Sequence, residues 1–167
     1  MSDDVIEMER MLNEYLQFAS SSSVEKTETF NLSELLESII SKYEKKEISM
    51  NIPGKIYLDG RKNLIIRCFN NLIDNSIKYS KNILITLKKS SNNILITIDD
   101  DGPGIPESER ENVFKPFYKI DKSRSDSKSS VGLGLSIASD IIRSHGGNIT
   151  LETSPAKGLR AKIFLPF

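Results

Sequence analysis

Apolar residues recur every three or four positions near the start of the chain. This helical spacing between Val5 and Ala19 predicts one amphipathic helix, with the apolar members Val5, Met8, Met11, Leu12, Tyr15, Leu16 and Ala19. Because the apolar stripe is narrow, we expect the helix to need a partner helix. Serines at 20–23 then indicate a flexible joint. We therefore predict a first segment over residues 1–23 and a domain over 24–167.

Helical and strand-like patterns then alternate irregularly. Helical spacing predicts helices from Asn31 or Ser33 to about Ile40, over Lys62–Tyr79 and over Gly134–Ser144, with a short helix around Glu107–Asn112. Strands are predicted over 27–30, 48–52 and 55–58 (around the turn at Pro53-Gly54), 82–89 and 94–99 (a hairpin), 148–153 and 159–167. Since the order lacks regular β-α-β alternation, we predict an α+β fold: a two-layer α/β sandwich, with helices covering a mixed, mostly antiparallel sheet.

Composition narrows the function classes. Lysine plus arginine equals aspartate plus glutamate at 23 each, so no overall field favours nucleic acid or an anionic membrane. No apolar run approaches the roughly 18 residues that cross a bilayer, and we expect a soluble domain. The single Cys68 lies in an apolar helical pattern, which predicts a buried, reduced thiol.

One polar stripe interrupts the helix predicted over Lys62–Tyr79. Asn71, Asn75 and Lys78 stand at helical positions i, i+4 and i+7, so they share a face. Amide oxygens can ligate Mg²⁺, and a lysine can neutralise phosphate. The alternative is an ordinary solvated helix face.

A turn with three acids, two glycines and two prolines follows the strand predicted over 94–99. Its glycines let the backbone approach a ligand closely, and its carboxylates can accept a hydrogen bond from a donor such as an exocyclic amine. The acids are consecutive and therefore do not fit the alternating spacing of a calcium loop. A plain acidic turn remains the alternative.

A Ser- and Lys-rich stretch over 119–130 lacks apolar periodicity and is predicted to be a mobile loop. It leads into Val131-Gly132-Leu133-Gly134-Leu135, where a helix is predicted to begin. Free backbone N–H groups at a glycine-rich helix start suit phosphate. The alternatives are a simple helix-entry turn and a solvated charged loop. The only histidine, His145, is predicted to have a structural role at a helix C-terminus, capped by Gly146-Gly147.

The order of these motifs resembles that of the histidine kinases. Residues 71–79, 98–106, 114–121 and 131–147 resemble the N, G1, F and G2 boxes of that family, and the likeness extends from about Thr29 to the last strand. The helix at residues 3–19 resembles the end of the second helix of the dimerising hairpin, and the chain as a whole resembles the EnvZ type of osmosensor kinase. The resemblance implies the GHKL (Bergerat) type of ATP-binding fold, with ATP and Mg²⁺.

The resemblance also implies roles for individual residues. Asn71, Asn75 and Lys78 would be catalytic, with Asn75 ligating Mg²⁺, Asn71 nearby and Lys78 contacting phosphate. Tyr79 would stack beside adenine, and Asp100 would receive the adenine amino group. The remaining nucleotide-binding positions would be Gly102, Gly104, Ile105, Tyr118, Lys119, Arg124, Gly132, Leu133, Gly134 and Leu135. Lys119 and Arg124 would be the basic residues of a lid over the phosphates.

The chain departs from the family pattern in two places, the glycine-rich box and the lid. Ser130 and Val131 stand where the family usually has a glycine and a small polar residue, so lid closure or affinity is expected to differ. Lys119 replaces a frequent arginine and gives up bidentate phosphate contact. Neither departure removes a core ligand.

The family's phosphoacceptor histidine lies on the first hairpin helix, before residue 1. The resemblance therefore implies a piece of a sensor kinase that binds Mg-ATP and transfers the γ-phosphoryl group to a histidine outside this chain, not to itself. Its implied partners are the dimerisation hairpin of its own or a sister chain and a response-regulator receiver domain, with no nucleic acid. A homodimeric parent in the bacterial inner membrane is implied, with this part cytoplasmic and monomeric or weakly associating.

Three other functions remain open from the sequence. An ATP-hydrolysing relative of the gyrase or Hsp90 kind would carry a glutamate at the position of Asn71, where an amide cannot act as a base. A serine-kinase anti-sigma factor would lack the N-terminal helix. A pure binding module would have lost nucleotide binding.

Overall fold

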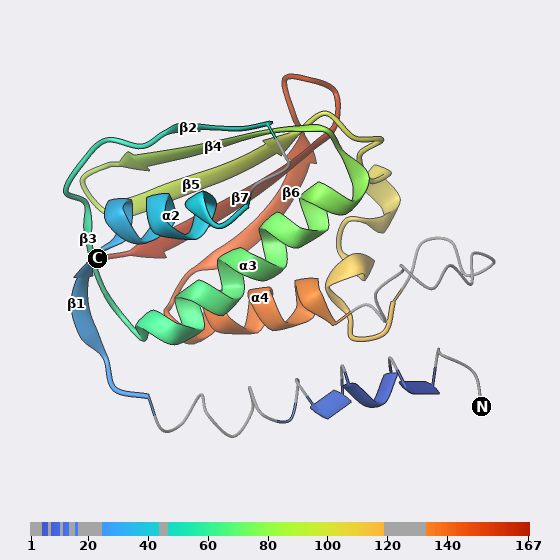
Figure 1. Cartoon of the computed structure of the whole chain (residues 1–167), viewed down its shortest axis with the longest axis horizontal. Coiled ribbons are helices and arrows are strands. Elements are labelled where there is room, and N and C mark those ends of the chain that lie inside the picture. The colour runs from blue at the N-terminus through green and yellow to red at the C-terminus, as the bar shows by residue number, and fades with distance from the viewer. Residues whose placement is uncertain are drawn as a thin grey trace.

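Residues 25–167, as far as the structure describes them, fold into two layers, with helices on one face of a sheet (Figure 1). The computed structural model describes residues 5–6, 8–10, 12–13, 16, 25–43, 47–118 and 133–167. The helices are α2 (Leu32–Ser41), α3 (Lys62–Tyr79) and α4 (Gly134–Ser144). The strands are β1 (Glu28–Asn31), β2 (Glu47–Asn51), β3 (Tyr57–Gly60), β4 (Asn82–Lys89), β5 (Asn93–Asp100), β6 (Asn148–Thr153) and β7 (Leu159–Pro166).

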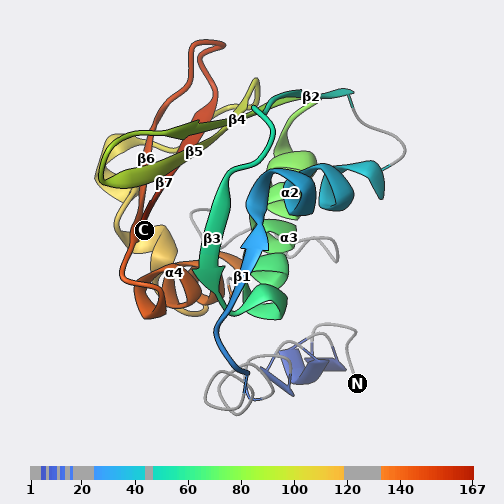
Figure 2. The ribbon, with the colours of Figure 1, turned by 90° about the vertical axis from the view of Figure 1, so that its left-hand side faces the viewer.

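The large sheet has the strand order β2-β4-β5-β7-β6. Strands β4, β5, β7 and β6 pair antiparallel with their neighbours, whereas β2 lies parallel to β4. The predicted mixed, mostly antiparallel sheet with helices on one face is therefore confirmed. The strands β1 and β3 form a separate antiparallel pair at one end of the helical layer (Figure 2).

The chain around Pro53-Gly54 differs in detail from the prediction. The strands on either side of this turn belong to different sheets, and β3 begins at Tyr57, two residues later than expected. Lys55 has a left-handed backbone (φ 64°), which is incompatible with an extended strand. The loop is tied to the start of α2, because Ser33 Oγ donates to the Pro53 carbonyl (2.6 Å) and accepts from the Ile56 N–H (3.2 Å). These bonds direct the chain across to β1.

Helix boundaries follow their sequence signals closely. Asn31 caps α2 by accepting the Glu34 N–H (3.1 Å), and α3 and α4 have the predicted bounds. The short helix expected around 107–112 is instead two 3₁₀ turns, Glu107–Glu109 and Asn112–Phe114. No helix among the described residues is long and apolar enough to span a membrane.

The core lies between the helices and the inner face of the sheet. The apolar stripe of α3 supplies Ile65, Phe69 and Ile73, which are fully buried, and the inner face of β5 supplies Ile94, Ile96 and Ile98. Cys68 is also fully buried as a free thiol, as predicted, and burial raises its pKa. Because these contacts bury the apolar face of α3, its polar face is the one available to a ligand.

The N-terminal segment is described only at separate positions. Residues 5–6, 8–10, 12–13 and 16 are helical, and the apolar side chains of Val5, Met8, Leu12 and Leu16 are exposed. Met11, Tyr15 and Ala19 lie outside the described residues, as does the predicted boundary at 23–24. The division into two segments therefore stays a prediction.

His145 links the N-terminal end of α3 to the C-terminal end of α4. The Arg61 N–H donates to His145 Nε2 (3.0 Å), and His145 Nδ1 contacts the Ile141 carbonyl (2.8 Å), so the ring is neutral with its proton on Nδ1. Glu25 caps the same end of α3, where its carboxylate accepts the N–H groups of Asn63 (2.7 Å) and Leu64 (3.2 Å). The histidine therefore has a structural position at the helix C-terminus, as expected from its sequence context.

This junction predicts a pH dependence of stability. Burial lowers the pKa of His145 from 6.5, with Arg61 adding to the effect and Glu25 opposing it. The unfolded chain therefore takes up a proton before the folded one, and stability is lost as pH falls from about 6.5 towards the lower folded pKa. Urea unfolding at pH 7.5, 6.5 and 5.5 should show a steeper loss for the wild type than for His145→Gln. Parallel curves for the two proteins would contradict this assignment.

Candidate functional site

The polar stripe of α3 lies beside its buried apolar face. Asn71 and Asn75 are half-buried and Lys78 is exposed, so all three side chains have access to solvent. The Lys78 ammonium lies over the ring of the neighbouring Tyr79, 5.4 Å from its centroid. Two amides and a cation therefore follow one another along the helix towards its C-terminal end, as the spacing predicts.

Asp100 ends β5 on the inner side of the sheet. Its side chain is buried, and Oδ1 accepts the N–H groups of Gly102 (3.0 Å) and Leu159 (2.9 Å). Among the described residues, no donor reaches the second oxygen, Oδ2. One carboxylate oxygen therefore holds the loop, and the other keeps its capacity to accept a hydrogen bond.

Two glycines make room for this carboxylate. A Cβ on Gly102 would lie 2.6 Å from the Tyr79 carbonyl oxygen, and one on Gly158 would lie 2.2 Å from the Asp100 carbonyl oxygen and 2.5 Å from its Oδ1. Gly102 was predicted as a site residue, whereas Gly158 was not. In the sequence Gly158 is only a glycine between two strands, and its contact with Asp100 arises from the pairing of β5 with β7.

Ser154 is a second residue that the sequence did not indicate. Its hydroxyl donates to the Asp100 carbonyl oxygen (2.7 Å) and accepts the Gly158 N–H (2.9 Å). The serine is buried. It therefore fastens the β6–β7 turn to the backbone of Asp100, and a serine among other turn residues gives no sign of this in the sequence.

The three consecutive aspartates separate in space. Asp99 faces the outer side of the sheet and pairs with the guanidinium of Arg160 (2.6 and 3.0 Å). Asp101 accepts the N–H groups of Lys81 (2.9 Å) and Asn82 (3.0 Å) and the Asn82 side-chain amide (2.8 Å). The hydrogen bonds from Asn82 and Lys81 lower the pKa of Asp101 to about 2. Of the three, only Asp100 is free to face a ligand on the helical side.

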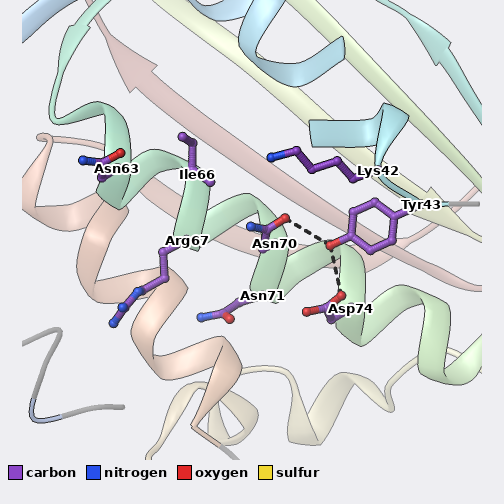
Figure 3. Close-up of a pocket in the computed structure, with 8 residues that line it drawn as sticks. All are labelled: Lys42, Tyr43, Asn63, Ile66, Arg67, Asn70, Asn71 and Asp74. Atoms are coloured by element: carbon purple, nitrogen blue, oxygen red, sulfur yellow. Dashed lines mark hydrogen bonds between the residues drawn. The ribbon is translucent and has the colours of Figure 1, made fainter. Parts of the chain in front are cut away.

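Two open hollows lie along α3. One, of about 480 Å³, is lined by Ile77, Lys78, Tyr79, Ser80, Lys81, Asp101, Gly102 and Pro103. The other, of about 560 Å³, is lined by Lys42, Tyr43, Asn63, Ile66, Arg67, Asn70, Asn71 and Asp74 (Figure 3). The first hollow brings together three of the predicted site residues, Lys78, Tyr79 and Gly102. Asn71 lines the second.

The other predicted residues lie near these features or outside the described residues. Gly104 has a left-handed backbone (φ 74°), and Ile105, Tyr118 and Leu135 are partly buried against the core. The Tyr118 hydroxyl donates to Glu109, which raises the pKa of Tyr118. Lys119, Arg124, Ser130, Val131 and Gly132 lie outside the described residues.

The start of α4 has the geometry of an anion site. Gly134 opens the helix, and a Cβ placed there would contact nothing within 4 Å. Leu133, which precedes it, is buried and contributes no side-chain cap. The first N–H groups of a helix have no partner within it, so those of α4 are suited to donate hydrogen bonds to phosphate oxygens.

The side-chain amides of α3 supply oxygen donors that suit a divalent metal bound together with ligand phosphates. The part of the chain that the structure describes contains no group of three or more His, Cys, Asp or Glu that could hold an ion. Mg²⁺ takes oxygen donors and commonly binds through one or two protein groups together with substrate phosphates. The amides of Asn71 and Asn75 fit that donor set.

Comparison with known proteins agrees with this geometry. Residues 60–167 match the family model described as "Histidine kinase-, DNA gyrase B-, and HSP90-like ATPase". The chain is 36% identical over 123 residues to the sensor histidine kinase CpxA of Escherichia coli K12, which covers 72% of this chain and 27% of that protein. It is 31% identical over 166 residues to the sensor histidine kinase GtrS of Pseudomonas aeruginosa PAO1, covering 98% and 34%. The chain thus spans about a third or less of these relatives.

A solved structure shows the same fold. The ATP-binding domain of PrrB from Mycobacterium tuberculosis superposes with a TM-score of 0.70 at 25% identity, covering 85% of this chain and 98% of that domain. These relatives do not favour the hydrolytic or anti-sigma alternatives.

Proposed function

Since this chain belongs to the family of histidine kinase-, DNA gyrase B- and HSP90-like ATPases, we propose that it is the nucleotide-binding catalytic domain of a sensor histidine kinase. In this proposal it binds Mg-ATP and presents the γ-phosphoryl group to a histidine on another segment. The observation that carries the proposal is the buried carboxylate of Asp100, whose Oδ1 is held by two backbone N–H groups while Oδ2 has no described donor.

The adenine end of the site is assigned to the loop after β5. Asp100 Oδ2 would accept the adenine amino group, and a carboxylate suits this role because it only accepts hydrogen bonds. Tyr79, which lines the hollow with Gly102, would lie beside the base. Gly104 and Ile105 complete this end, where the left-handed backbone of Gly104 turns the loop back towards Gly158.

The phosphate end is assigned to the polar stripe of α3 and the start of α4. Lys78 would contact the phosphates, and Asn75, with Asn71 near it, would hold Mg²⁺, which supplies charge neutralisation to the triphosphate. The backbone at Gly132 and Gly134 would donate N–H groups, with Lys119 and Arg124 acting from the lid. Leu133, Leu135 and Tyr118 would form the apolar base of this region.

The phosphoacceptor is assigned to a segment outside this chain. Both ring nitrogens of the only histidine, His145, are engaged, with the Arg61 N–H and the Ile141 carbonyl. It also lies at the end of α4 opposite the proposed phosphate site. Asn71 cannot activate water as a glutamate would, so hydrolysis is expected to be slow and the γ-phosphoryl group is kept for transfer.

The relatives named above also support a proposal about the wider protein. We propose that the parent is a homodimeric sensor kinase whose hairpin carries the acceptor histidine and whose phosphoryl group passes to a response-regulator aspartate. The parent would lie in the bacterial inner membrane, with this domain on the cytoplasmic side. The exposed Val5, Met8, Leu12 and Leu16 would pack in the hairpin.

Binding and labelling of the wild-type chain test this proposal. Calorimetric titration with a non-hydrolysable ATP analogue should show binding that is stronger with Mg²⁺ than with a chelator. Incubation with γ-labelled ATP should leave no acid-labile label on the chain and release phosphate slowly. Absence of Mg-dependent binding would make the domain a nucleotide-free module, and rapid hydrolysis abolished by Asn71→Ala would make it an ATPase. Acid-labile label on the chain itself would refute an external acceptor.

A further inference from the structure

Tyr43 joins the end of α2 to the middle of α3. Its hydroxyl lies 3.1 Å from Asn70 Oδ1 and 3.0 Å from Asp74 Oδ1 (Figure 3). These two acceptors stand one helical turn apart on α3, and the phenol bridges them from the side of α2. Sequence patterns did not single out any of the three residues.

The bridged residues are the chain neighbours of the proposed metal ligands. Asn70 precedes Asn71, and Asp74 precedes Asn75. Successive helical residues are turned by about 100°, so the Asn70–Asp74 stripe runs alongside the Asn71–Asn75 stripe. The Asp74 carboxylate therefore lies next to the proposed phosphate end of the site.

Asp74 also stands four residues before Lys78. An acid four positions before a lysine is in the favourable orientation for an ion pair on a helix surface. If the Asp74 carboxylate turned that way, it would engage the ammonium that is assigned to the phosphates. It would also place a negative charge beside the triphosphate.

The phenol of Tyr43 opposes this turn. Burial and the nearby charge of Asp74 both raise the pKa of Tyr43, so its hydroxyl stays protonated and remains a donor. Asp74 itself is exposed, and no other hydrogen bond from a described residue holds its carboxylate. The Tyr43 hydroxyl is thus the group that holds this carboxylate on the α2 side.

We propose that Tyr43 is a positioning residue for phosphate binding: its hydroxyl retains the Asp74 carboxylate on the α2 side of α3 and so keeps this negative charge away from Lys78 and the triphosphate. The inference rests on the proposed function, because it deepens the role of the same site. It does not require Tyr43 to touch the nucleotide.

Loss of the hydroxyl should leave the fold in place. The apolar face of α2 is buried through Leu32, Leu36, Ile39 and Ile40, which do not depend on the phenol oxygen. Phenylalanine at 43 keeps the ring and removes only the donor. The matched control is Tyr57→Phe, the same change at an exposed tyrosine in β3.

The test compares ligands with and without phosphates. In Tyr43→Phe, affinity for the Mg-bound ATP analogue should fall about tenfold, as expected for losing one charge-assisted phosphate contact. Competition by adenosine, which has no phosphates, should be unchanged, and Tyr57→Phe should bind both ligands as the wild type does. Adding Asp74→Asn to Tyr43→Phe should restore most of the lost affinity, because the released side chain is then neutral.

The outcomes distinguish a structural role of Tyr43 from the proposed positioning role, and both from failure of the proposed function. Equal loss for the analogue and adenosine would mean that Tyr43 is merely structural, and so would failure of Asp74→Asn to rescue. Unchanged affinity for the analogue in Tyr43→Phe would overturn the inference and leave the proposed function standing. A wild-type chain that binds no nucleotide would refute the proposed function and this inference with it.

Discussion

Asparagine in place of Asp100 is expected to weaken ATP binding roughly 100-fold while the domain stays folded, since a hydrogen bond to a charged group contributes about 1.5–3 kcal/mol. The amide oxygen can take over the role of Oδ1, which accepts from Gly102 and Leu159. The amide nitrogen replaces Oδ2 and turns an acceptor into a donor. It would then face the adenine amino group, which is also a donor.

Changing the base of the nucleotide distinguishes loss of the adenine contact from a general loss of structure in the variant. Inosine triphosphate carries a carbonyl oxygen where adenine carries its amino group, so Asp100→Asn should lose the wild-type preference for ATP over inosine triphosphate. Titration of both nucleotides against both proteins measures the preference, and thermal melting checks the fold. Asp59→Asn, the same change at an exposed aspartate of β3, should leave both affinities unaltered. Asp100→Asn binding ATP as tightly as the wild type would remove Asp100 from the site.

Alanine in place of Gly158 is expected to destabilise the domain by about 4 kcal/mol or prevent its folding, the range of large steric defects. The added Cβ would meet the Asp100 carbonyl oxygen at 2.2 Å, its Oδ1 at 2.5 Å and the Gly102 nitrogen at 2.7 Å. Two of these atoms are backbone in a paired strand and its loop, so they cannot swing aside. Relief requires β5 and β7 to move apart or the Asp100 loop to leave its place.

Urea unfolding of Gly158→Ala measures the loss. Gly54→Ala is the matched control, because a Cβ at Gly54 would contact nothing within 4 Å, and it should change stability by less than about 0.5 kcal/mol. If Gly158→Ala folds but with a displaced loop, its affinity for the ATP analogue should be lost as well. Wild-type stability and affinity in Gly158→Ala would show that the close packing around Asp100 is not required.

The sequence predicted those parts of the fold in which a local pattern decides the structure. The bounds of α3 and α4 follow from helical spacing, and β4 and β5 from alternation around a turn. The start of β3 was wrong by two residues, because the left-handed backbone of Lys55 is imposed by the tie between its loop and α2. Nothing at Lys55 in the sequence signals that conformation.

The residues of the candidate site also divide into those that a local motif predicts and those that depend on the packing of distant segments. Lys78, Tyr79 and Gly102 belong to local motifs, and the structure brings them to one hollow. Ser154 and Gly158 reach Asp100 only because β5 pairs with β7, and this is a contact between distant parts of the chain. Tyr43 likewise meets Asp74 through the packing of two helices. Such residues can be identified only once the strand order and the helix packing are known.

The three consecutive aspartates at 99–101 show that the pairing register of the sheet determines which carboxylate reaches the site. A slip of β5 by one residue would still offer a carboxylate at the position of Asp100, so the acidic run alone would accept the wrong alignment. The same slip would turn the fully buried Ile94, Ile96 and Ile98 towards solvent and separate Asp99 from Arg160. Burial of the three isoleucines therefore fixes the register of β5. A misaligned strand would still place a carboxylate at the site, but exposing the isoleucines would cost too much free energy for it to form.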